Sequence, residues 1–143
     1  MVLTLMVFVA LVGGTLIFLK SDPPLEATAV ASDDHQHFVI VGFGNSGWGD
    51  IQLTEVAVNN YEEPVEAKIQ MSNPTLGFIM TDDFESTEAQ PYRFTNINEA
   101  IIKTNTSPTA TLEKQNNGTA SEDDETYGLT IMHDDVIHTV HIK

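Results

Sequence analysis

Residues 65–71 read VEAKIQM, and apolar and polar side chains alternate along this stretch. An alternation with a period of two places the apolar side chains on one face of a β-strand and the polar side chains on the other. Turn-forming residues bound the stretch on both sides, at 59–64 and at 72–74. Residues 65–71 are therefore predicted to form a half-buried strand.

The same reasoning extends over most of the chain. Apolar or alternating runs bounded by turn chemistry predict further strands at residues 38–41, 51–58, 76–80, 92–94, 127–131 and 136–142. The last two flank His133-Asp134-Asp135 and are predicted to form a hairpin. Residues 96–103 are compatible with one helical turn, and residues 104–125 are predicted to be mostly loop. Six to eight short strands predict an all-β fold, specifically an immunoglobulin-like β-sandwich.

Composition limits the function classes. The chain has 143 residues with 21 acidic and 6 basic side chains, so its formal net charge is −15. Such a surface repels phosphate, which excludes nucleic-acid binding. The absence of cysteine excludes disulfides, thiolate catalysis and cysteine-ligated zinc.

Residues 1–19 read MVLTLMVFVALVGGTLIFL and contain no charged side chain. As an α-helix they would extend about 28 Å, close to the hydrocarbon thickness of a bilayer. We therefore expect residues 1–20 to be a transmembrane anchor, residues 21–36 a linker, and residues 37–143 a domain outside the cytoplasm. The alternative is that the N-terminal segment is a signal peptide, cleaved near Ala31, and that the protein is secreted. Ala29-Val30-Ala31 has the small-residue pattern of a cleavage site.

The stretches HFVIVGFGNSGWGDIQLTEVAVNN (residues 37–60) and EEPVEAKIQMSN (residues 62–73) resemble a group of uncharacterised, membrane-anchored small proteins of Bacillus-type bacteria. The resemblance implies an exported, membrane-bound protein with an unknown role. It implies no catalytic residue.

A glycine-rich stretch follows the first predicted strand of the domain. Residues 42–47, GFGNSG, match the G-x-G-x-x-G pattern of dinucleotide-binding proteins, but Trp48-Gly49 follows where that motif requires a helix. The serine in GNSG lacks a suitably spaced histidine and aspartate for a protease triad. A loop is the simpler interpretation, and its side chains Phe43, Asn45 and Trp48 are candidates for contact with a ligand or partner.

Two polar stretches contain potential metal ligands. His35 and His37 would share one face of an extended segment beside Asp33-Asp34. Asp82, Asp83 and Glu85 provide oxygen ligands suited to calcium, although they do not match an EF-hand loop. In both places a solvated loop without a metal is the simpler interpretation.

The sequence therefore predicts a membrane-anchored binding or structural module rather than an enzyme, with an unknown protein or envelope partner. A calcium-binding envelope domain is the first alternative, and a small hydrolase is the second.

Overall fold

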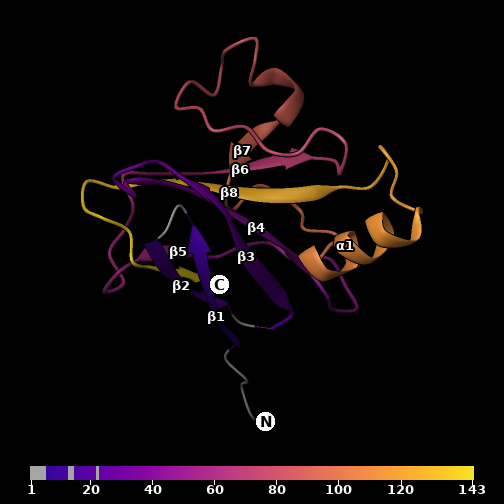
Figure 1. Cartoon of the computed structure of the whole chain (residues 1–143), viewed down its shortest axis with the longest axis horizontal. Coiled ribbons are helices and arrows are strands. Elements are labelled where there is room, and N and C mark those ends of the chain that lie inside the picture. Colours follow the sequence, from indigo (N-terminus) through magenta and orange to yellow (C-terminus); the bar gives the residue numbers. More distant parts are fainter. Residues whose placement is uncertain (1–5, 13–14, 22) are drawn as a thin grey trace.

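A computed structural model describes residues 6–12, 15–21 and 23–143 and is mostly β. The described strands form two sheets (Figure 1). In order across each sheet, sheet A contains β1 (Met6–Val12), β2 (Thr15–Ser21), β9 (Thr139–Ile142) and β5 (Val56–Val58), and sheet B contains β3 (Leu25–Ser32), β4 (Phe38–Asn45), β8 (Thr126–Met132), β6 (Glu66–Ser72) and β7 (Phe94–Asn96). The pairs are antiparallel except β2–β9, which is parallel. One α-helix, α1 (Pro108–Asn117), and a 3-10 turn, η1 (Gln90–Tyr92), complete the described elements.

Apolar side chains from both sheets form one core. Sheet A contributes residues of β2, β5 and β9, and sheet B contributes alternate residues of β3, β4, β6 and β8, all part of the same buried cluster. In β4, for example, Val39, Val41 and Phe43 belong to the cluster. The predictions of an all-β fold and of a sandwich-like arrangement are confirmed at this level.

The described residues of the N-terminal segment form strands instead of the predicted helix. These strands are β1 and β2, and β2 lies between β1 and β9 in sheet A. Ile17 and Leu19 are fully buried while Phe18 between them is exposed, which is the period of a strand. None of the helices in the described part of the chain has the length and apolar character needed to cross a membrane. Hydropathy alone cannot distinguish a buried strand from a helix in such a run.

The segment expected to be a linker also belongs to the fold. Residues 25–32 form β3, which pairs with β4, and Ala31 lies opposite Ile40. A cleavage near Ala31 would therefore remove β1, β2 and most of β3 from the two sheets.

Further along the chain the structure confirms some predictions and corrects others. Residues 66–72 form β6, close to the predicted limits, whereas residues 76–80 form no strand. The C-terminal strands β8 and β9 exist, but β8 belongs to sheet B and β9 to sheet A, so the predicted hairpin pairing is wrong. Residues 108–117 form α1 instead of a loop.

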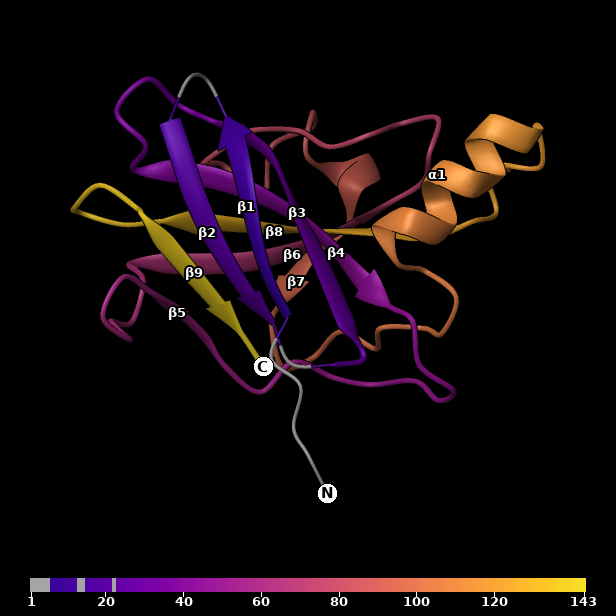
Figure 2. The same ribbon diagram turned by 60° about the horizontal axis from the view of Figure 1, so that its bottom comes forward.

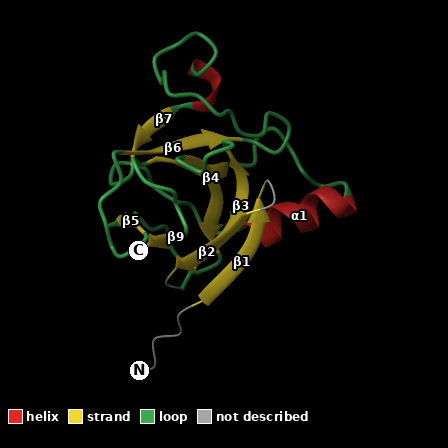
Figure 3. Cartoon of the chain, turned by 60° about the vertical axis from the view of Figure 1, so that its left-hand side comes forward, coloured by secondary structure: helices red, strands yellow, loops and turns green. Residues whose placement is uncertain are grey.

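Helix α1 follows from local capping chemistry. The Ser107 hydroxyl accepts a hydrogen bond from the Ala110 amide, Pro108 occupies the first turn, and Gly118 ends the helix with a positive φ of 78°. The helix lies beside β3 and β4, on the side of the molecule away from β5 and β9 (Figures 2 and 3).

Candidate functional site

The glycine-rich stretch does not present the three side chains expected of an interaction loop. Phe43 and Asn45 belong to β4 and are buried, so neither is available to a partner. The Asn45 amide nitrogen donates to the carbonyl oxygens of Gly49 (2.7 Å) and Ile102 (3.1 Å), which makes it a structural residue. Trp48 alone of the three is fully exposed.

The structure does not bring the predicted metal ligands into a common site. The rings of His35 and His37 lie 6.3 Å apart edge to face, and His35 is exposed. Asp82, Asp83 and Glu85 line an open hollow together with Lys68, whose ammonium group opposes cation binding there. No three ligating groups of these five residues converge within the described part of the chain.

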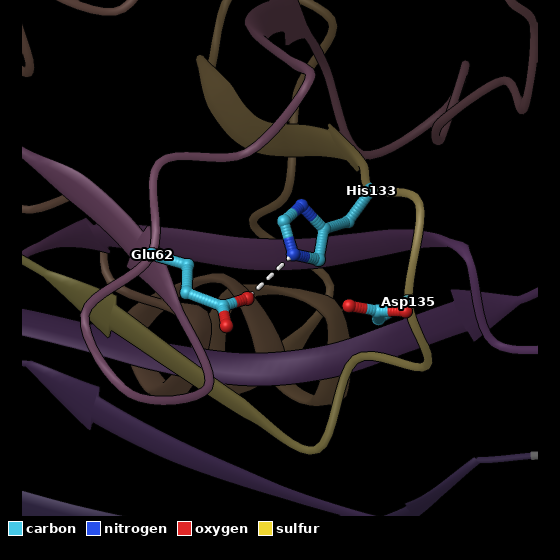
Figure 4. A group of neighbouring side chains, drawn as sticks. All are labelled: Glu62, His133 and Asp135. Carbon is cyan, nitrogen blue, oxygen red and sulfur yellow. Dashed lines mark hydrogen bonds and ion pairs between the residues drawn. The ribbon is translucent and has the colours of Figure 1, made fainter.

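A different group of side chains does converge. Glu62, His133 and Asp135 each place one ligating atom within 4.8 Å of the others (Figure 4). His133 Nε2 and Glu62 Oε2 are 2.8 Å apart. The His133 side chain is only 9% exposed, whereas the Glu62 side chain is 46% exposed. The cluster is therefore a largely buried imidazole facing two solvent-accessible carboxylates.

Backbone geometry positions Glu62. Reciprocal hydrogen bonds of 2.9 Å join the amides and carbonyls of Val58 and Glu62, which closes a tight turn after β5. Asn59 and Tyr61 have positive φ values of 55° and 62° within that turn. A positive φ is tolerated by asparagine better than by most residues, which suits Asn59 to this position.

Asn59 also connects this turn to the chain after β8. Its side-chain oxygen accepts from the amides of His138 (2.8 Å) and Thr139 (3.4 Å), and its side-chain nitrogen donates to the carbonyl of Val136 (3.0 Å). Glu62 therefore faces the β8–β9 connection because the β5–β9 pairing and the Asn59 side chain together hold the two segments side by side.

The segment that carries His133 and Asp135 is fixed by hydrogen bonds to residues 36 and 37. The His133 amide donates to the His37 carbonyl (2.9 Å), and the Ile137 amide donates to the Gln36 carbonyl (2.9 Å). The buried Gln36 side chain returns a hydrogen bond to the Ile137 carbonyl (2.6 Å). The backbone on both sides of Asp135 is thus fixed.

Of the two ring nitrogens of His133, only Nε2 is placed to bind a cation. Nδ1 is buried and has no hydrogen-bond partner within the described part of the chain, whereas Nε2 points toward Glu62. A neutral imidazole nitrogen with two carboxylates is a donor set suited to zinc and similar ions.

A second histidine lies beside the Glu62 turn. His141 stacks on Tyr61 with ring centroids 4.2 Å apart, and its Nε2 contacts the Asn59 carbonyl at 3.1 Å. Burial lowers the pKa of His141 and outweighs the hydrogen bond to Asn59, which acts in the opposite direction. This histidine is consequently neutral at pH 7 and packs as an aromatic ring.

Sequence reasoning could not have assembled the cluster. Glu62 and His133 are 71 positions apart, and each lies in a short polar turn that resembles many others in an acidic chain. His133-Asp134-Asp135 is visible in the sequence as a turn, but no spacing rule connects it with Glu62. The pairing of β5 with β9 and the side-chain hydrogen bonds of Asn59 bring the two turns together.

No family model matches this chain, and neither a curated protein nor a solved structure does.

Proposed function

We propose that this protein is a binding module that holds a divalent transition-metal cation, with Zn²⁺ as the best match, at Glu62, His133 and Asp135. The observation that carries the proposal is the convergence of three ligating atoms, one of them on a largely buried imidazole, within 4.8 Å of one another. Two turns that are distant in sequence and bridged by Asn59 supply them. Zinc would use three protein ligands and complete its coordination with water.

The distances are compatible with such a site after a small adjustment. Zinc–ligand distances of about 2.0–2.2 Å in a tetrahedron separate the ligand atoms by about 3.3–3.6 Å. The separation of 2.8 Å between His133 Nε2 and Glu62 Oε2 would have to increase by roughly half an ångström, as a cation replaced the shared proton. Both carboxylates belong to exposed residues, so this adjustment requires no change in the core.

The donor set favours a transition metal over calcium. Calcium takes about six to eight oxygen ligands, whereas this cluster offers one imidazole nitrogen and two carboxylates. The formal charge of −15 raises the local concentration of any divalent cation but does not distinguish among them.

We also propose that the module is an immunoglobulin-like domain located outside the cytoplasm at the membrane. The support for this location is the hydropathy of residues 1–19 alone, because Ile17 and Leu19 pack in the core of the described fold. Binding through turns at the ends of strands is the usual arrangement in two-sheet domains. Protease accessibility of the full chain in intact cells of its source, compared with lysed cells, tests this location. Degradation only after lysis would contradict it.

Isothermal titration of the full chain with ZnCl₂ tests the proposal. We expect saturable binding of one Zn²⁺ and much weaker binding of Ca²⁺. His133→Gln and Asp135→Asn should each weaken zinc binding at least tenfold. At zinc concentrations about 100-fold above Kd, the free energy of unfolding should rise by about 2.7 kcal/mol.

Adjacent residues provide matched controls. Asp134→Asn removes the same charge one position earlier, and His138→Gln removes an exposed imidazole from the same connection. Neither residue belongs to the cluster, so both variants should bind zinc like the wild type. The proposal fails if zinc does not bind, or if Asp134→Asn weakens binding as much as Asp135→Asn does.

A further inference from the structure

A cavity of about 230 Å³ lies between α1 and sheet B, and none of the residues that line it belongs to the metal-ligand cluster. The residues that line it include the apolar Val30, Phe78 and Leu112 and the hydroxyl-bearing Thr111 and Thr126. No charged side chain is among the described residues that line it. In a chain with a formal charge of −15, such an uncharged lining favours a neutral occupant over an ion.

The cavity lies beside a flat part of sheet B. Gly42 of β4 and Gly128 of β8 are directly opposite each other in the strand register. A Cβ atom at Gly128 would lie 2.8 Å from two carbons of the Phe78 ring, so the absence of side chains lets that ring approach the backbone. Backbone and an aromatic ring form planar surfaces, and planar surfaces suit a planar molecule.

Helix α1 covers the cavity and is fixed near both ends. Near its start, Glu26 of β3 accepts a 3.0 Å hydrogen bond from the Thr109 amide. Toward its end, Lys114 pairs with Asp124 at 3.2 Å. Yet none of the residues of α1 is buried, and Leu112 is 55% exposed.

A helix of this length usually depends on a buried apolar face, because short helices are marginal by themselves. Here the apolar side chain of Leu112 borders a cavity instead of filling it. An occupant between α1 and the sheet would supply the missing contacts.

One polar group at the cavity is unpartnered. The Thr126 hydroxyl is buried and forms no hydrogen bond within the described part of the chain. Ser72, directly opposite Thr126 across β6 and β8, also has an unpartnered buried hydroxyl. A buried hydroxyl without a partner is unfavourable. Rotation of the Thr126 side chain would turn this hydroxyl toward the cavity, where a polar atom of an occupant would relieve the cost.

We propose that this cavity binds a small, uncharged aromatic alcohol, with its ring between α1 and sheet B and its hydroxyl at Thr126. The volume suits such a molecule, because a cavity of about 150 Å³ accommodates benzene. The ring replaces empty space beside Leu112 and Phe78, and the hydroxyl pairs with Thr126 after rotation about its χ1 angle.

Titration of the full, isotopically labelled chain with p-cresol, followed by NMR of the Gly42 and Gly128 amides, tests this site. We expect saturable shifts at both amides. Thr126→Val keeps the shape but removes the hydroxyl, so p-cresol should bind about five- to tenfold more weakly while toluene binds unchanged. Thr111→Phe fills the cavity from the helix and should abolish binding of both compounds.

Glu113→Phe is the control for Thr111→Phe, because Glu113 lies on the same helix but is exposed and does not line the cavity. It should bind p-cresol like the wild type. The proposal is overturned if the two glycine amides do not shift saturably, or if Thr111→Phe binds p-cresol as the control does. Equal losses of p-cresol and toluene affinity in Thr126→Val would overturn the position of the hydroxyl.

Discussion

Two replacements of Asn59, by glycine and by alanine, separate what its side-chain hydrogen bonds contribute to the free energy of unfolding from what its backbone conformation costs. The side chain makes two short hydrogen bonds, to the His138 amide (2.8 Å) and to the Val136 carbonyl (3.0 Å), and a longer one from Thr139. At about 1 kcal/mol for each short bond, Asn59→Gly should lose about 2 kcal/mol of unfolding free energy.

Asn59→Ala loses the same hydrogen bonds and must also hold a Cβ-bearing residue at a φ of 55° without a polar side chain. The left-handed conformation adds about 1 kcal/mol, so this variant should lose about 3 kcal/mol in total. For a chain of this size, Tm should fall by about 6–12 °C in Asn59→Ala and by about two thirds as much in Asn59→Gly.

Thermal unfolding monitored by circular dichroism, with EDTA present to exclude metal effects, measures both variants. The order of stability is the decisive result. If Asn59→Gly is as stable as the wild type, the side chain does not connect the two turns. If Asn59→Ala and Asn59→Gly are equally stable, the positive φ carries no cost and that part of the reasoning is wrong.

Three further predictions concern other parts of the molecule. Gly128→Ala places a Cβ 2.8 Å from the Phe78 ring, so urea denaturation should show a loss of about 1–3 kcal/mol. The folded-state pKa of His141 lies below its usual 6.5, so the unfolded chain binds a proton at this residue before the folded chain does as the pH falls. The free energy of unfolding should therefore decrease as the pH falls below 6.5. Denaturation curves of His141→Gln should lack this part of the pH dependence. Burial opposes ionisation of Glu125, but hydrogen bonds from Tyr127 and a lysine outweigh it and lower the pKa of that carboxyl. The stability that the Glu125 carboxylate contributes is therefore present above pH 4.5 and is lost at lower pH. Tyr127→Phe should reduce the free energy of unfolding at pH 7 by about 1–2 kcal/mol and make acid unfolding less steep below pH 4.5. An acid titration followed by circular dichroism measures both effects.

Local patterns predicted several elements because their determinants are local. The alternation in residues 66–72 and 126–132 places one face of each strand in the core, and both strands form where the period of two predicts them. Helix α1 was missed although its caps, Ser107 and Gly118, are visible in the sequence, since its polar composition hides any apolar face. Those caps were the available signal.

The N-terminal segment shows the limit of hydropathy. An uncharged apolar run is compatible with a membrane helix and with a buried strand, and which of the two forms depends on the segments that pack against it. Here β9, more than a hundred residues away in the sequence, pairs with β2, and Ile17 and Leu19 pack into the shared core. Pairing partners at such separation leave no mark within the segment itself.

That the chain is acidic and free of cysteine is read directly from the amino-acid sequence. That it is built mainly of short strands is also visible there, because period-two patterning acts over a few residues. The three-dimensional fold was needed to show which strands share a sheet and that Glu62, His133 and Asp135 meet. The physical reason is that hydrogen bonds such as those of Asn59 join turns that are distant along the chain, and their energies depend on three-dimensional distance instead of sequence spacing.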